Sequence, residues 1–151
     1  MRRAVPILII AVIGFAVGVQ AVLAGMTQTS TLRALLNANQ QVPPQVVSAR
    51  GAIGEFNGSL LHKASGKGTL SWHLTYNKLS SPATSAYIFF AKSGKHGQVV
   101  VGLCTKCKAS TSGTTPTGVI VTKALTSRTG YVTIRTKKNP KGEISGKLRV
   151  G

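Results

Sequence analysis

The chain has 151 residues, of which 19 are Lys or Arg and only 2 are Asp or Glu, so its formal net charge at pH 7 is +17. This length is typical of a single domain. Two carboxylates and three histidines leave few groups for acid–base catalysis or metal binding, and they form no recognisable catalytic site. The composition therefore favours a binding or structural protein over an enzyme, and it implies no cofactor.

The first 24 residues differ in composition from the rest. Arg2 and Arg3 give a basic start, and residues 4–24 are almost wholly apolar. This pattern, with modest side chains before Ala24, is typical of an export signal cleaved after that residue. The alternative is an uncleaved membrane anchor through residues 4–24, since about 20 apolar residues span a bilayer. In both cases we expect the rest of the chain to lie outside the cytoplasm, with a charge of +15 after cleavage because 17 basic and 2 acidic residues remain.

Residues 31–151 are predicted to form one all-β domain, after a polar lead-in over residues 25–30 that we expect to be flexible. Short apolar or alternating segments are separated by Gly, Pro and Asn, which is typical of a sandwich or barrel. The predicted strands lie at residues 31–36, within 49–61, and at 67–76, 85–91, 99–103, 131–136 and 143–150. Residues 118–127 are ambiguous between a strand and one helical turn. The sequence predicts an antiparallel β-sandwich of Ig-like or Greek-key type with about seven or eight strands.

Three of these strands have informative side-chain patterns. Residues 67–76 place Leu70, Trp72 and Leu74 on one face, which predicts a half-buried strand. Residues 85–91 are apolar on both faces, so we expect this strand in the middle of a sheet. In the last strand the predicted inward residues are Ile144, Leu148 and Val150, and the predicted outward residues are Glu143, Ser145, Lys147 and Arg149. We expect Glu143 to pair with a nearby lysine or to cap the turn after Pro140.

Three segments resemble the chordin-type (CHRD) domain, a family of exported β-domains. Residues 35–44 resemble the family's leading L-x-G-x-x-E-V-P-P, and residues 94–103 resemble its G-x-x-G-x-V-V-x-x-L. Residues 130–148 resemble its closing G-x-Y-V-N-V-H-T…P-x-G-E-I-R-G-Q-L. The order and spacing of these segments cover nearly the whole domain. The resemblance implies a β-domain whose family lacks a single shared activity.

The chain departs from the family pattern where the family has histidines. The family's A-H-I-H reads Ala-Tyr-Ile-Phe at residues 86–89, and its N-V-H-T reads Thr-Ile-Arg-Thr at residues 133–136. In the family these histidines could form a metal-binding or hydrogen-bonding cluster. Here Tyr87, Phe89 and Arg135 replace them, so we expect no metal. If the faces that carry these residues meet, Arg135 should lie over an aromatic ring in a cation–π contact.

Cys104 and Cys107 are the only two cysteines, with two residues between them. An exported protein with two cysteines usually pairs them, so we predict a structural disulfide. One alternative is a redox-active pair, because Lys106 and Lys108 would favour the thiolate. Another is a metal site, although the two thiols lack further ligands at a suitable spacing. Redox motifs of this type begin a helix beside a βαβ unit, whereas this one follows a predicted strand.

Basic residues are densest near the C-terminus of the chain. The cluster consists of Arg135, Lys137, Lys138, Lys141, Lys147 and Arg149. Because the last two strands form a hairpin around residues 139–142, these charges could share one edge and bind a polyanion. The alternative is a solubilising edge that blocks further strand pairing.

Other features exclude several functions. The histidines His62, His73 and His96 lie on separate segments, and we expect no catalytic role for them. We find neither a helix suited to a DNA groove nor an aromatic motif for RNA stacking, so specific nucleic-acid binding is not expected. No small-molecule substrate is indicated. The sequence predicts an exported, non-enzymatic module of the cell envelope or extracellular space that binds an anionic polymer or membrane surface. The alternatives are a thiol–disulfide or metal-linked redox protein and a purely structural envelope component.

Overall fold

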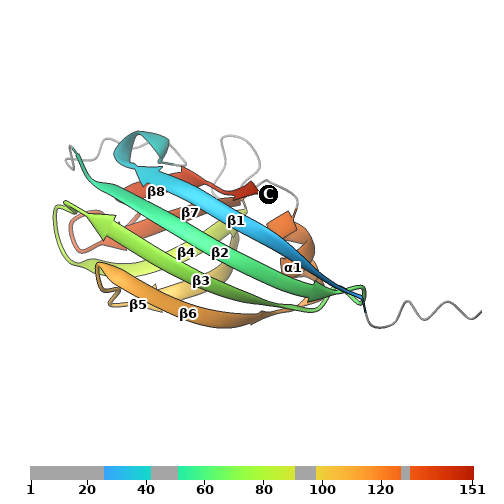
Figure 1. The fold of residues 1–151 in the computed structure, drawn as a ribbon. Coiled ribbons are helices and arrows are strands. Elements are labelled where there is room, and N and C mark those ends of the chain that lie inside the picture. The colour runs from blue at the N-terminus through green and yellow to red at the C-terminus, as the bar shows by residue number, and fades with distance from the viewer. Residues whose placement is uncertain (1–25, 42–50, 91–97, 127–129) are drawn as a thin grey trace, which may run out of the picture.

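The computed structural model describes residues 26–41, 51–90, 98–126 and 130–151. Within these ranges the chain forms a nine-stranded sheet with one α-helix and one 3-10 turn (Figure 1). The elements in chain order are β1 (Thr27–Asn37), η1 (Ala38–Gln40), β2 (Ile53–Lys63), β3 (Gly68–Asn77), β4 (Ala83–Phe90), β5 (Gln98–Thr105), β6 (Ser110–Thr117), α1 (Val119–Thr126), β7 (Gly130–Thr136), β8 (Ile144–Lys147) and β9 (Arg149–Val150). The predicted all-β fold is confirmed.

The strands form one antiparallel sheet that curls into two layers. Their order is β5-β4-β7-β8-β1-β2-β3-β6, and β9 pairs with β1. One layer contains β1, β2, β3 and β6, and the other contains β4, β5, β7 and β8 (Figure 1). The layers are continuous where β8 pairs with β1 through Asn37 and Ser145. The predicted antiparallel, sandwich-like architecture is therefore confirmed, with its two layers joined where β1 pairs with β8 and β9.

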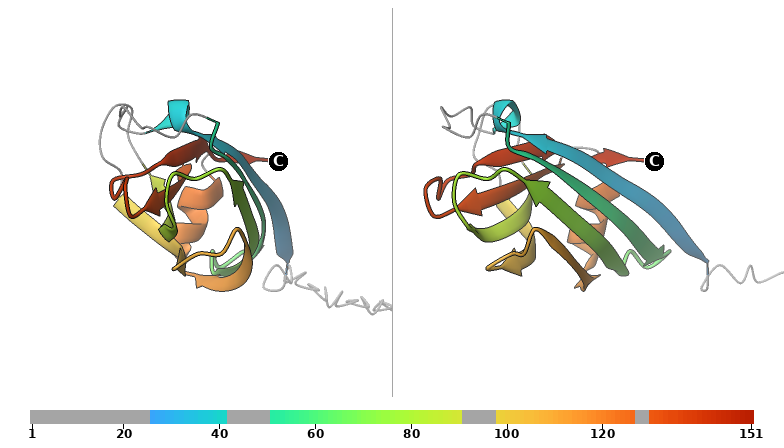
Figure 2. Two further views of the ribbon diagram at one scale, coloured as in Figure 1. Left: turned by 90° about the vertical axis from the view of Figure 1, so that its left-hand side faces the viewer. Right: turned by 60° about the vertical axis from the view of Figure 1, so that its left-hand side comes forward.

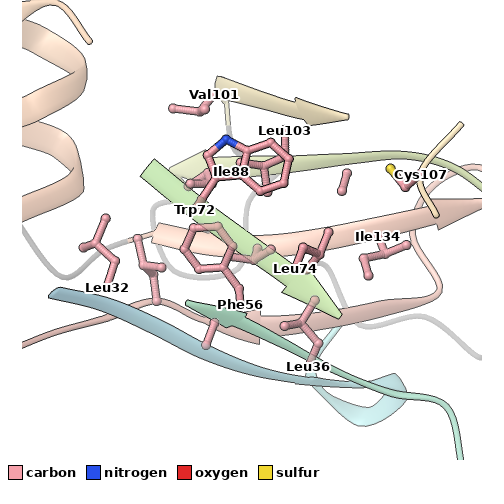
Figure 3. Packing of buried hydrophobic residues seen from close by; sticks show 14 of the residues in the cluster. Leu32, Leu36, Phe56, Trp72, Leu74, Ile88, Val101, Leu103, Cys107 and Ile134 are labelled. Atoms are coloured by element: carbon pink, nitrogen blue, oxygen red, sulfur yellow. The ribbon is translucent and has the colours of Figure 1, made fainter. Parts of the chain in front are cut away.

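The hydrophobic core lies between the two layers. As predicted, Leu70, Trp72 and Leu74 of β3 are buried, and alternate residues of this strand face away from the core. Figure 3 shows Trp72 of β3 and Ile88, which belongs to the opposite layer, among the side chains of the same buried cluster. The strand β4 lies between β5 and β7, which confirms the central position that its two apolar faces predicted.

The first strand is longer than its sequence indicates. Its first four residues, 27–30, pair with residues 60–63 of β2. The prediction of a flexible lead-in was therefore wrong for residues 27–30. Threonine is favourable in strands, and pairing with β2 satisfies the backbone of this polar segment although it lacks apolar side chains.

The strand β6 was missing from the sequence prediction. Its sequence, STSGTTPT, has no apolar alternation, and Thr117 is its only buried residue. Hydrogen bonding to β3 along its whole length holds it in the sheet as an edge strand, where Pro116 is tolerated. Its Gly113 is required by packing, because a Cβ atom there would lie 2.5 Å from Cζ2 of Trp72.

The ambiguous residues 118–127 contain the helix α1, which lies between the layers at one end of the sheet (Figure 2). Its Leu125 is fully buried, and the hydroxyls of Thr122 and Thr117 are 2.8 Å apart. These contacts tie the helix to the end of β6. Within the described ranges, the chain has no helix with the length and hydropathy needed to cross a membrane.

Two residues of the last strand contradict the outward orientation predicted for them. Ser145 does alternate with the core residue Ile144, but it is fully buried because Gln41 covers it and accepts its hydrogen bond (3.1 Å). Glu143 is also fully buried. As predicted, Lys147 and Arg149 are exposed, whereas Ile144 and Leu148 are buried.

The contact between Trp72 and Gly113 generates a stability prediction. Gly113→Ala should lower the free energy of unfolding by about 1–3 kcal/mol, because a methyl group has no space beside the indole ring. Chemical denaturation would measure this loss. The control is Gly102→Ala, since nothing lies within 4 Å of a Cβ atom at Gly102. Equal effects of the two substitutions would contradict the packing argument.

Candidate functional site

The structure divides the predicted basic cluster into three groups. Lys137, Lys138 and Lys141 are exposed on the turn between β7 and β8. Lys147 lies opposite Tyr131, at the end of β7 that is farthest from this turn. Because β7 and β8 run antiparallel, the hairpin separates residues that the sequence suggested would share one edge. Arg135 forms the third group, on the face of β7 that packs against aromatic rings.

Lys147 and Arg149 instead join a basic residue from the other end of the chain. They line a hollow of about 360 Å³ together with Arg33, Ala34, Leu35, Gln40 and Glu55. Arg33 of β1 lies directly opposite Arg149 of β9. Like charges directly opposite each other in a sheet are destabilising, unless an anion lies between them. We call Arg33, Lys147 and Arg149 the basic hollow.

Arg33 could not be assigned to this site from the sequence, because no local signal shows which strand β1 will pair with. The one carboxylate of the lining, Glu55, accepts a hydrogen bond of 2.9 Å from the amide of Asn57. Beyond Glu55, the same surface continues into a second hollow of about 420 Å³. Leu35 and Ile53 line this second hollow and are exposed by 71% and 57%.

The positions of the family's histidines lie together on neighbouring strands. The guanidinium carbon of Arg135 is 5.1 Å from the ring centroid of Tyr87 and 5.4 Å from that of Phe89. The two ring centroids are 5.9 Å apart. This geometry arises because β4 and β7 are paired, with Ser85 opposite Arg135. The cation–π contact predicted from the sequence is present.

Polar residues extend this arrangement along β7 and β8. The hydroxyls of Thr133 and Ser145 are 2.7 Å apart, and Ser145 also donates to Gln41, which stands where the family pattern has Glu. Nε2 of Gln41 and Nε of Arg135 are buried without a hydrogen-bond acceptor within the structure. Among the described residues, no three His, Cys, Asp or Glu side chains gather as a metal site. The side chains at these positions are hydrogen-bonding and stacking groups rather than a ligand set.

A family model, that of the CHRD domain, matches residues 32–148. The chain belongs to the CHRD domain family. No curated protein and no solved structure matches it. The match runs from the middle of β1 to Leu148, so it covers the Arg135 stack and two residues of the basic hollow, Arg33 and Lys147, and it ends one residue before Arg149. CHRD domains are in general non-catalytic modules.

Glu143 joins three segments of the CHRD domain through hydrogen bonds. Its carboxylate accepts from the hydroxyls of Ser80 (2.7 Å) and Thr136, from the side-chain amide of Asn139 (2.8 Å) and from the backbone N–H of Ser80. All of these donors are uncharged, so the expected pairing with a lysine is wrong. The carboxylate does tie down the β7–β8 turn, because Asn139 belongs to that turn, and it also fixes the loop before β4.

These hydrogen bonds set the titration of the carboxyl. Burial alone raises the pKa of Glu143, but the hydrogen bonds from Thr136, Ser80 and Asn139 outweigh burial and hold its pKa below the ordinary value of 4.5. The Glu143 carboxylate therefore binds a proton more weakly in the folded state than in the unfolded chain.

The two cysteines of the CHRD domain are joined in a disulfide with a Cα–Cα distance of 5.4 Å. The bridge closes the turn after β5. Tyr76 of β3 donates a hydrogen bond of 2.6 Å to the carbonyl of Cys107, and the N–H of Lys106 donates to Thr84 (2.8 Å). The next element is the strand β6 and not a helix, so the bridge lacks the setting of a helix N-terminus that activates redox cysteines.

The histidines remain on separate elements of the described structure. His62 lies on β2, and Nδ1 of His73 on β3 is 2.7 Å from the hydroxyl of Ser112. The partner of His73 is thus a serine on the edge strand β6 and not a carboxylate, which a catalytic triad would need. His96 lies outside the described residues.

The Arg135 stack should contribute to stability. Arg135→Ala should lower the free energy of unfolding by about 0.5–2 kcal/mol, because it removes the cation from both rings. A double-mutant cycle with Tyr87→Leu would isolate the contact by thermal or urea unfolding. Lys137→Ala, on the exposed turn, is the control and should have little effect. An Arg135→Ala protein with an unchanged melting temperature would contradict the role of the stack.

Glu143 should make the CHRD domain sensitive to acid. Because its folded-state pKa lies below that of the unfolded chain, its contribution is fully present above about pH 5 and is lost as the pH falls through the folded-state pKa. Glu143→Gln should lower the stability at pH 7 by about 1–3 kcal/mol, since an amide cannot accept all these bonds, and should flatten the decline below pH 5. Urea unfolding between pH 3 and pH 7 would measure both effects. The exposed Glu55→Gln is the control and should leave the acid-dependent decline in place.

Proposed function

We propose that this CHRD domain is an exported, non-enzymatic module that binds an anionic polymer of the cell envelope or extracellular space through its basic hollow. The observation that carries the proposal is the placement of Arg33 directly opposite Arg149, with Lys147 in the same lining. Glu55 supplies one negative charge to this lining, so the three cations leave a net positive charge that a bound anion would offset. The hollow is thus suited to a phosphate, sulfate or carboxylate group of a polymer.

The charge of the whole chain supports this proposal. A net charge of +17 attracts polyanions from a distance, and salt screens the attraction over about 8 Å at physiological ionic strength. Such attraction is diffuse and acts on any polyanion. A defined site requires cations held close together by the fold, and the pairing of Arg33 with Arg149 supports such a site.

Two further features support action outside the cytoplasm. The first 24 residues have the composition of an export signal. The disulfide between Cys104 and Cys107 is typical of oxidising compartments.

Removal of the basic hollow should weaken polymer binding more than an equal loss of charge elsewhere. The triple variant Arg33→Ala, Lys147→Ala, Arg149→Ala should bind fluorescently labelled polyphosphate about tenfold more weakly, a loss of ~1.4 kcal/mol. The control variant Lys137→Ala, Lys138→Ala, Lys141→Ala removes the same three charges from the exposed turn and should lose about twofold or less. Fluorescence anisotropy at about 0.15 M and about 0.5 M salt would measure both affinities.

The comparison separates a site from diffuse attraction. Equal losses in the two variants, with binding abolished by the higher salt in the unmodified protein, would mean that the net charge acts alone. Equal melting temperatures of the two variants would establish that the difference arises from binding and not from folding.

A further inference from the structure

Three exposed apolar side chains gather at the end of the sheet where β1 begins. Ile120 is exposed by 83%, Met26 by 62% and Val119 by 49%. Met26 and Val119 belong to segments that contact the β2–β3 turn, because the carbonyl of Met26 accepts from the N–H of Ala64 (3.3 Å) and Val119 lies against Gly66. Figure 1 shows the start of β1, this turn and α1 at the same end of the molecule. Met26 and Val119, from separate segments, thus line one hollow at this end, and the exposed Ile120 follows Val119 in α1.

Three lysines lie beside this apolar surface. Lys63 and Lys123 line a hollow of about 440 Å³ together with Met26 and Val119, and the N–H of Lys63 bonds to the carbonyl of Lys67 across the turn (2.9 Å). The chain has two acidic side chains in all, and both lie elsewhere. Glu55 lines the basic hollow, and Glu143 is buried beside the β7–β8 turn. Apolar side chains with a border of lysines are typical of surfaces that dock on anionic lipid.

The sequence before β1 brings lipid close to this surface. The apolar residues 4–24 end two residues before Met26, and two residues reach at most about 7 Å. Whenever residues 4–24 lie in a bilayer, the start of β1 must therefore lie at the bilayer surface. The opposite end of the sheet, which carries the disulfide and the β7–β8 turn, then points away from the membrane.

We propose that this end of the CHRD domain docks on the surface of an anionic bilayer. Met26, Val119 and Ile120 enter the interface between headgroups and acyl chains, and Lys63, Lys67 and Lys123 contact anionic headgroups. We call these six residues the docking tip. The docking tip is separate from the basic hollow, so this inference does not depend on polymer binding.

The test places a fluorescent reporter on the docking tip of the full chain. Ile120→Trp is reconstituted into phosphatidylglycerol vesicles whose acyl chains carry bromine, which quenches indole fluorescence on contact. The control is Thr105→Trp, which places the reporter at an exposed position at the opposite end of the sheet. The native Trp72 is buried in the core and gives both proteins the same background. We expect quenching of the Ile120→Trp protein at least about twofold greater than that of the control.

Charge reversal tests the lipid class. In the Ile120→Trp protein, Lys63→Glu, Lys67→Glu and Lys123→Glu together should reduce quenching to the level of the control, and so should replacement of phosphatidylglycerol by phosphatidylcholine. Because the three lysines are exposed, the melting temperature should change little. Quenching that is insensitive to both changes would overturn the assignment to anionic lipid.

Two other results would overturn docking itself. One is equal quenching of the Ile120→Trp and Thr105→Trp proteins. The other concerns the emission of the introduced indole in the Ile120→Trp protein. If this emission is blue-shifted before vesicles are added and is not quenched by them, the docking tip is covered by another part of the chain or by a second copy.

Discussion

The pairing of β1 on both of its edges is the constraint on which the rest of the structure depends. One edge pairs with β2 along its whole length, and the other pairs with β8 and β9 near the C-terminus. This arrangement makes one continuous sheet from two layers, so that a single core forms between them. It also brings together parts of the chain that are far apart in sequence. The basic hollow exists because β9 returns to β1 and places Arg149 opposite Arg33.

The replaced histidines show how a CHRD domain can retain its strand pairing while the side chains at one site change character. Tyr87 and Phe89 supply ring faces, and Arg135 supplies a cation above them. The polar residues beside them bond to one another, through Thr133, Ser145 and Gln41. Because β4 and β7 are adjacent, the pairing brings these positions close together. The fold thus fixes their proximity, and the sequence determines whether the result is a ligand set or a stabilising stack.

The sequence predicted those features that depend on local pattern. Alternation identified β3, apolar residues on both faces identified β4, and the family pattern identified the contact of Arg135 with its aromatic neighbours. The strand β6 was missed because Ser and Thr carry no apolar period, and its place depends on pairing with β3. The burial of Glu143 could not be predicted, since one of its partners, Ser80, is 63 residues away. Arg33 was missed for the same reason, because its neighbour Arg149 is set by long-range strand register.

The scarcity of carboxylates connects the two proposed surfaces. One of the two, Glu143, is buried and bonded to uncharged groups, so Glu55, in the lining of the basic hollow, is the one acidic side chain at the surface. The basic hollow and the docking tip lie at different positions along β1. Arg33 lies six residues beyond Thr27, about 20 Å at the rise of ~3.3 Å per residue in a strand. A CHRD domain docked through its tip would therefore hold the basic hollow up to about 20 Å above the headgroups, the full distance when β1 stands upright on the membrane. At that height, well beyond the screening length of ~8 Å, the hollow can bind an envelope polymer without competition from the lipid surface.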